Sequence, residues 1–152
     1  MTSPELGILV GSWRLLSVEA TFTDTGERVA TFGPEPSGRV VVTETGRIMF
    51  LITRSNRIPA ADDAARASLF NATIAYSGTI LLTGPNEFVT TVEMSLFPEE
   101  VGMEKRRLFR IQGDRLIITI PQQTSRVTGR RVAVSELIWL REPVTTPAKI
   151  DD

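Results

Sequence analysis

The chain has 152 residues, of which 17 are basic and 18 acidic, and it contains neither histidine nor cysteine. This length suits one compact domain with its own core. The near-zero net charge argues against a nucleic-acid or membrane-surface partner. Without imidazole or thiolate groups the chain has no Ser-His-Asp or Cys-His catalytic device, and it lacks the usual ligands of zinc, copper and haem. We therefore expect no metal and no cofactor.

The same composition bears on where the protein works. A chain without cysteine has no disulfide framework, and the opening stretch MTSPELGILV lacks the basic region and long apolar core of a signal peptide. No apolar run approaches the roughly 20 residues that a bilayer-spanning helix needs. These observations lead us to expect a cytoplasmic protein.

Apolar and polar residues alternate over short runs that end at glycine-bearing turns, a pattern typical of an all-β meander. A short helical turn is predicted to begin at Ser3-Pro4-Glu5 and to lead into Gly11. The turns TDTGE and TETGR each supply a glycine for a tight reversal. In this first part of the chain, strands are predicted at 12–22, 28–32, 38–43 and 47–54.

One segment breaks the alternation and is predicted to be helical, at 59–72. Pro59 stands at the expected first helical position, and Asp62 and Asp63 fall in the first turn, where carboxylates favour a helix N-terminus. Alanine is frequent over the rest of the segment, as in a strong helix former. The helix must lie across a barrel end or along the barrel wall, and across the mouth it would act as a lid.

The alternating pattern resumes after the helix and continues almost to the end of the chain. Strands are predicted here at 73–83, 86–97, 103–112, 115–121 and 131–141. The tail at 143–152, with two prolines and no apolar periodicity, is predicted to be disordered. Closure removes the exposed edges of such a sheet, so we predict a single domain at 1–142, an up-and-down antiparallel β-barrel of eight or nine strands.

Alternation along each strand predicts which residues face the barrel interior. If Trp13 points inward, Leu15, Ser17 and Glu19 follow it, and Leu16 and Val18 point outward. On the last strand, inward Arg141 brings Ser135 and Trp139 with it. The strand at 86–97 can be read either way; we favour Val92 and Met94 inside and Glu93 on the surface. Other inward residues by the same parity are Ile48, Phe50, Ile52, Ile74, Tyr76, Ile80, Leu82, Lys105, Arg107, Phe109, Ile111, Leu116, Ile118, Ile120, Ala133 and Leu137.

Few polar residues are placed inside by this alternation, chiefly Glu19, Tyr76 and Arg107, with Arg54 near a strand end. A buried charge is costly unless it is paired, so Glu19 and Arg107 form either a structural ion pair or part of a site. Tyr76 is either a core tyrosine with its hydroxyl bonded near a barrel end or a hydrogen-bond donor to a ligand. Both interpretations stay open at this point.

Gly11 and Trp13 at the start of the first strand, with Arg141 at the end of the last, resemble the lipocalin pattern. The blocks GSWRLLSVEA, FGPEPSGRVVVTETGRIMF, IAYSGTILL, VEMSLFPEEVG, RRLFRIQGDRLIIT and ELIWLRE resemble successive blocks of the lipocalin-like domain family of small bacterial and fungal proteins. The resemblance covers roughly residues 8–142. It implies a barrel whose lower end is closed by the indole with the arginine packed across it, and a fold that hosts both carriers and enzymes.

Two functions therefore stay open, each with a hydrophobic small molecule inside the barrel. The favoured one is a cofactor-free cyclase or isomerase of secondary metabolism, similar to barrel pericyclases, with Glu19, Tyr76 and Arg107 as catalytic residues. The alternative is a non-catalytic carrier, and a barrel filled by its own side chains would exclude both. A homodimer is left open. The predicted ligand contacts are Ser17, Phe50, Arg54, Phe70, Glu93, Met94, Phe109, Ser135 and Trp139.

Overall fold

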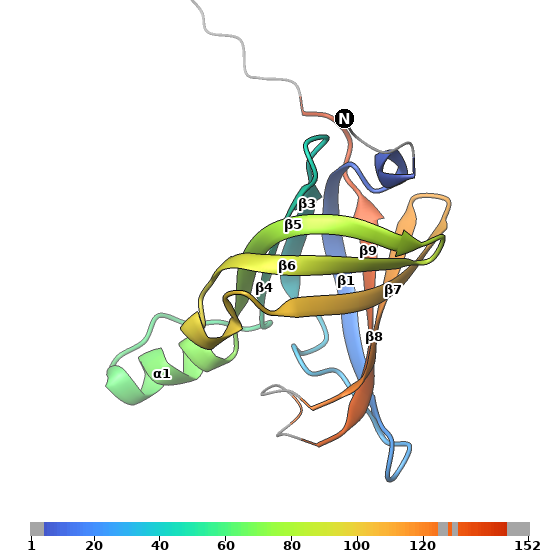
Figure 1. Cartoon of the computed structure of the whole chain (residues 1–152). Helices are drawn as coiled ribbons and strands as arrows, with labels where there is room; N and C mark the ends of the chain where they lie inside the picture. Colours follow the sequence, from blue (N-terminus) through green and yellow to red (C-terminus); the bar gives the residue numbers. More distant parts are fainter. Residues whose placement is uncertain (1–4, 125–127, 129–130, 146–152) are drawn as a thin grey trace, which may run out of the picture.

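A computed structural model describes residues 5–124, 128 and 131–145 (Figure 1). In chain order its elements are η1 (Leu6–Ile8), β1 (Gly11–Phe22), β2 (Arg28–Val29), β3 (Ser37–Val42), β4 (Arg47–Thr53), α1 (Asp63–Asn71), β5 (Ile74–Gly84), β6 (Glu87–Ser95), η2 (Pro98–Glu100), β7 (Glu104–Gln112), β8 (Arg115–Gln123) and β9 (Ala133–Arg141). Every predicted strand is present, although β2 is only two residues long.

Neighbouring strands pair antiparallel in the order β2-β1-β3-β4-β5-β6-β7-β8-β9, and β1 also pairs with β9. This last pairing closes β1 and β3 to β9 into an eight-stranded barrel with β2 as an extra strand on β1. The predicted up-and-down barrel is confirmed. Closure leaves few unpaired strand edges, as expected for a sheet built from consecutive hairpins.

The helix α1 begins later than predicted, at Asp63 rather than near Pro59. Asp62 is its N-cap, with backbone in the extended region, and the Asp62 carboxylate accepts a 2.8 Å hydrogen bond from the backbone N–H of Ala65. Because this side chain satisfies a first-turn donor, the helix starts after it, and the prediction for Pro59 was wrong. Figure 1 shows α1 beside the barrel, at the end away from η1.

A bulge in β1 changes which of its residues face inward. Leu15 pairs with Trp139 but Ser17 pairs with Ile138, so Leu16 is an extra residue in the ladder. Beyond this bulge the inward side chains have even numbers, and Val18, Ala20 and Phe22 are buried. The predictions that Ser17 and Glu19 point inward and Val18 outward were therefore wrong.

A second bulge lies where β5 meets β6. Ser77 pairs with Met94 and Gly78 with Val92, so Glu93 is the extra residue. Val92 is buried as predicted and Glu93 lies on the surface, as favoured. Met94, however, points outward with 64% of its surface exposed, because the extra residue reverses the alternation after Val92. The inward prediction for Met94 was wrong.

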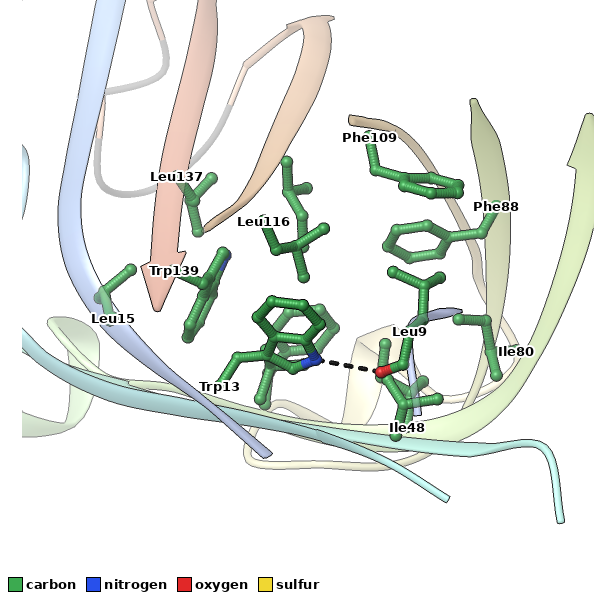
Figure 2. Close-up of a cluster of buried hydrophobic side chains, with 14 of the residues drawn as sticks. Leu9, Trp13, Leu15, Ile48, Ile80, Phe88, Phe109, Leu116, Leu137 and Trp139 are labelled. Atoms are coloured by element: carbon green, nitrogen blue, oxygen red, sulfur yellow. Dashed lines mark hydrogen bonds between the residues drawn. The ribbon is translucent and has the colours of Figure 1, made fainter. Parts of the chain in front are cut away.

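One end of the barrel is closed by η1 and Trp13. The fully buried indole donates a 3.0 Å hydrogen bond from Nε1 to the backbone oxygen of Leu9, drawn in Figure 2. The Arg141 guanidinium lies 4.0 Å from the centre of the Trp13 ring and donates to the backbone oxygens of Ile8 and Val10. The predicted arrangement of tryptophan and arginine is thereby confirmed.

Gly11 stands at the same closed end. Its φ of +132° is a conformation that favours glycine, and a Cβ there would lie 3.5 Å from the Arg141 guanidinium. The glycine thus lets the chain enter β1 directly beneath the arginine.

The main core cluster fills the barrel next to this closed end and continues along the inner walls toward the other end. Figure 2 shows Phe88 and Phe109 packed near Leu9, and Trp139 beside Leu137 and Leu116. The predicted inward residues Ile48, Phe50, Ile52, Tyr76, Ile80, Phe109, Leu116, Ile118, Leu137 and Trp139 are all buried in this cluster. Ile74, Leu82, Ile111 and Ile120 pack against it.

A polar clamp joins three strands on the outside of the closed end. The Glu142 carboxylate accepts hydrogen bonds from Ser12 Oγ at 2.6 Å and from Arg39 at 2.6 and 3.0 Å. These donors, Arg39 first and then Ser12, lower the pKa of Glu142 from 4.5 to about 2. The clamp ties the end of β9 to β1 and β3.

This lowered pKa predicts a specific pH dependence of stability. Because the folded pKa lies below the unfolded one, Glu142 stabilises the fold above pH 4.5, and that contribution is lost as the pH falls towards 2. We expect E142Q to be less stable than the wild type above pH 5, with the difference vanishing near pH 2. The effect is modest since Arg39 is largely exposed. Urea unfolding at several pH values checks this, and a difference independent of pH would contradict it.

Both ends of the chain extend past the described residues. Ser3 and Pro4, in the predicted opening turn, lie outside them, and η1 follows directly after Glu5. Of the predicted tail, 146–152 also lie outside, while 143–145 are exposed and have no regular structure. Within the described part of the chain, no helix is both long and apolar enough to cross a membrane.

Candidate functional site

A cavity of about 720 Å³ occupies the barrel between the core cluster and the end opposite η1. Its inner lining is buried and its outer lining is exposed, so the cavity opens to solvent at that end. The described lining residues are Val18, Thr31, Phe32, Phe50, Ile52, Ile74, Tyr76, Glu99, Glu100, Met103, Glu104, Lys105, Arg106, Arg107, Ile118, Ile120, Pro121, Gln122, Gln123, Thr124, Thr128, Ser135 and Leu137.

The floor and the inner part of the walls are apolar, whereas the rim carries polar residues such as Gln122, Gln123 and Thr124. Phe50 and Ile118 come from β4 and β8, and Leu137 from β9 lies directly across from Val18 in the β1–β9 ladder. Phe32, in the connection between β2 and β3, is fully buried and completes this apolar lining. Burial of an apolar molecule against such walls is favourable by about 25 cal/mol per Å² of apolar surface.

The beginning of β7, together with η2 and the beginning of β5, forms one polar wall of the cavity. Tyr76 comes from the start of β5, Lys105 and Arg107 from β7, and Glu100 from η2. The Lys105 ammonium forms an ion pair with Glu100 and lies 4.5 Å from the centre of the Tyr76 ring. Glu100 also accepts a 2.7 Å hydrogen bond from Ser95 Oγ. We name these four residues, 76, 100, 105 and 107, the polar wall.

Tyr76 is held in its neutral form. Burial raises the pKa of its hydroxyl, the positive charge of Arg107 lowers it, and the negative charge of Glu100 raises it. Because the effect of burial is the largest, the net direction is upward. At neutral pH, Tyr76 therefore offers an O–H donor at the cavity wall.

Arg107 is the buried cation of the polar wall, with 7% of its surface exposed. It pairs across the ladder with fully buried Phe88, so its side chain faces the interior as predicted. One guanidinium nitrogen donates a 2.9 Å hydrogen bond to the backbone oxygen of Arg106. Within the described part of the chain, no carboxylate lies within 4.0 Å of the guanidinium nitrogens of Arg107.

Three buried side-chain donors lack a hydrogen-bond partner among the described residues: Thr90 Oγ1, which does not line the cavity, Thr31 Oγ1 and Trp139 Nε1. Thr31 lines the cavity, whereas Trp139 lies beneath it, in ring contact with Phe50 at 5.9 Å between centroids. Figure 2 shows the Trp139 nitrogen pointing toward Leu137, away from Trp13. Thr31 and Trp139 therefore have unused hydrogen-bonding capacity close to the apolar lining.

Four of the predicted site residues line the cavity: Phe50, Tyr76, Arg107 and Ser135. Phe109 and Trp139 face inward as predicted but belong to the packed core beneath it. Phe109 packs on Phe88 with ring centroids 5.8 Å apart. The barrel thus has a filled half and a hollow half.

The remaining predicted site residues lie elsewhere. Glu19 is on the outer surface, 42% exposed at its side chain, and forms an ion pair with Arg28 of β2; it is not a partner of Arg107. Arg54 is exposed past the end of β4 and does not line the cavity. Ser17, Glu93 and Met94 are directed outward by the two bulges.

Phe70 is directed away from the cavity by the position of α1. Its ring meets the edge of Phe97 at 4.8 Å between centroids, in the segment that joins β6 to η2. No residue of α1 is among the described cavity lining, so the helix stands beside the barrel and does not cover the mouth. The prediction that Phe70 contacts a ligand in the cavity was wrong.

Sequence reasoning missed Val18, Phe32 and Glu100. Val18 is signalled by the change of parity in the apolar residues of β1, from 13 and 15 to 18, 20 and 22. Phe32 and Glu100 lie in connections, where no periodicity indicates the direction of a side chain. An apolar cavity with one polar wall can hold an apolar body and orient an oxygen atom attached to it.

A family model described as a lipocalin-like domain matches residues 10–142. The chain is also similar to the crystal structure of Rv2717c from M. tuberculosis, with a TM-score of 0.43 and 11% identity over 94% of this chain and 100% of that one. No curated protein matches the sequence significantly. Since the family model covers the whole barrel, from the residue before Gly11 to the clamp residue Glu142, the chain belongs to the lipocalin-like domain family.

Proposed function

We propose that this protein binds a hydrophobic small molecule in its barrel cavity and carries or sequesters it. The observation that carries this proposal is the cavity itself, whose volume of about 720 Å³ falls in the usual range for small-molecule sites. Its floor is apolar and its mouth opens past the end of the strands. Since the chain has no cysteine to oxidise, we place this activity in the cytoplasm.

The pairing of the polar groups favours a carrier over an enzyme. Glu100 and Lys105 are bonded to each other, so the carboxylate of the polar wall is not free to accept a proton. The pKa of Tyr76 is raised by burial, and the nearby Arg107 opposes this only in part. Glu19, which the sequence predicted as a proton-transfer group, lies on the outer face of the barrel, away from the cavity. A polar wall whose carboxylate is already bonded to an ammonium holds a molecule more readily than it transfers a proton to it.

A cofactor-free cyclase or isomerase of secondary metabolism is the second candidate, because Tyr76 and Arg107 both face the cavity. Together they could polarise a carbonyl oxygen of an enclosed substrate while the apolar walls fix its conformation. An incubation experiment distinguishes the carrier from the enzyme. The protein is incubated with a hydrophobic extract of the source organism, and the bound and released molecules are identified by mass spectrometry and NMR. Return of the bound molecule unchanged selects the carrier; release of an isomer, lost in Y76F, selects the enzyme.

The cavity proposal is tested by filling the cavity. Ser135 is a small, half-buried residue of the lining, and S135W places an indole in the space that a ligand would occupy. We expect S135W to weaken binding of the neutral dye Nile red by more than tenfold, a loss of at least about 1.4 kcal/mol. Fluorescence titration measures this directly.

L81W is the matched control. Leu81 lies on the outer face of β5 and is 68% exposed, so an indole there adds the same group without entering the cavity. We expect L81W to bind Nile red as the wild type does. If S135W binds the dye equally well, or if the wild type does not bind it, the proposed function is wrong.

A further inference from the structure

Arg107 carries a buried positive charge in the cavity wall, and no carboxylate in the described part of the chain forms an ion pair with it. Glu99, Glu100 and Glu104 also line the cavity, but Glu100 pairs with Lys105 and the other two are exposed at its rim. Arg106, the neighbouring arginine, pairs with Glu87 at 2.7 Å. None of the described carboxylates therefore forms an ion pair with Arg107.

An uncompensated buried guanidinium is costly unless something supplies negative charge or hydrogen-bond acceptors. Arginine carries five N–H donors in a planar fork, and one guanidinium nitrogen of Arg107 donates to the Arg106 backbone oxygen. The Tyr76 hydroxyl lies close enough for the positive charge of Arg107 to act on its pKa. Several donors thus remain for another partner. Because Arg107 lines the cavity and no nitrogen of its guanidinium is among the buried, unpartnered atoms of the described residues, these donors are available from the cavity to solvent or to a ligand.

Tyr76 adds a second donor beside the same position. Its raised pKa keeps the hydroxyl protonated, so the O–H can donate to the oxygen that the guanidinium binds. A carboxylate fits both groups, because a guanidinium binds it in bidentate fashion and a phenol donates to either of its oxygens. The apolar floor formed by Phe50, Ile118 and Leu137 then receives the rest of the molecule.

We propose that the ligand is an apolar acid whose carboxylate pairs with Arg107 and Tyr76 while its hydrocarbon part lies against the apolar floor. This inference rests on the proposed function, since it requires the cavity to be the binding site. It adds the chemical class of the ligand and its orientation, with the acidic group at the polar wall and the apolar part toward Phe50.

The test compares probes that share one hydrocarbon chain and differ in the polar end. Dodecanoic acid, dodecan-1-ol, methyl dodecanoate and dodecylamine are titrated at pH 8, below their critical micelle concentrations, as competitors of bound Nile red. For the wild type we expect the acid to bind at least tenfold more tightly than the alcohol or the ester, and the amine to bind weakest.

Two substitutions locate the origin of this preference. R107M keeps an unbranched side chain but removes the charge. We expect the acid and the alcohol to bind R107M with affinities that differ by less than threefold. R107K keeps a charge and should retain part of the preference, whereas Y76F should reduce it less than R107M does. Circular dichroism checks that each variant is folded. The Nile red affinity of each variant is measured first, so that acid and alcohol are compared as a ratio within one variant.

The outcomes separate the two proposals. If the acid and the alcohol displace Nile red from the wild type with equal affinity, the inferred acid is wrong and the cavity as a binding site stands. If the preference survives in R107M, the carboxylate does not pair with Arg107 and the inference is likewise wrong. If neither Nile red nor any probe binds, the proposed function fails together with it.

Discussion

W13F is expected to lower the free energy of unfolding by about 3 kcal/mol. This loss is large, because the whole free energy of unfolding of a folded domain is typically about 5–15 kcal/mol. Trp13 is fully buried at the closed end, and phenylalanine would leave part of its volume empty. The change also removes the donor to the Leu9 backbone oxygen, 3.0 Å away, and leaves that acceptor unpaired. A smaller ring under Arg141 further weakens their stacking.

W139F is the matched control for this prediction. Trp139 is equally buried and loses the same volume, but its Nε1 has no hydrogen-bond partner among the described residues. We expect it to be less costly than W13F by about 1–2 kcal/mol, the value of a lost buried hydrogen bond and the stacked cation. Urea denaturation followed by circular dichroism measures both, and equal losses would show that the Leu9 and Arg141 contacts contribute nothing.

The fold could be predicted from the sequence because its signals are local and repeated. Apolar alternation gives each strand its period, and glycine-bearing turns such as TDTGE and TETGR mark where one strand ends. Consecutive antiparallel strands of this number close most readily as a barrel. The residues at the closed end, Trp13 and Arg141, could be found from the family resemblance, and strand parity was then counted from them.

The candidate site was only partly predictable, since it depends on register. A single extra residue, Leu16, reverses the alternation of β1 and moves Glu19 to the outer surface, where it meets Arg28. The change of parity between Leu15 and Val18 was visible in the sequence and would have placed Val18 in the cavity. Tyr76 and Arg107 lie on strands that keep their alternation up to these residues, so both were placed correctly.

The bulge in β6 had no such signal. Val92 and Met94 have the same parity and are both apolar, so the sequence places them on one face. The structure separates them because the backbones of β5 and β6 approach each other closely at Gly78, which pairs with Val92. A Cβ on Gly78 would lie 1.9 Å from the backbone oxygen of Thr91. The direction of Met94 is therefore determined by a glycine on the neighbouring strand.

Replacing this glycine is expected to have the other large effect: G78A should lower the free energy of unfolding by about 3 kcal/mol. The neighbour at 1.9 Å is backbone and cannot rotate away, so β5 and β6 must separate and the bulge must rearrange. A glycine in an unstrained strand would show the opposite sign, since alanine restricts the unfolded chain and stabilises by about 0.4–1 kcal/mol. Thermal and urea unfolding determine the sign and the size.

Gly84, at the end of the same strand, is the matched control. A Cβ there would lie 3.9 Å from the Cβ of Glu87, an ordinary contact, and we expect G84A to change stability by less than about 1 kcal/mol. The rearranged bulge in G78A should also move Met94 and Ser95, and Ser95 donates to Glu100 in the polar wall. NMR chemical shifts that change around Glu100 in G78A but not in G84A would link the bulge to the site. A G78A variant as stable as G84A would mean that the two strands can separate at no cost, and the bulge would then not be what directs Met94 outward.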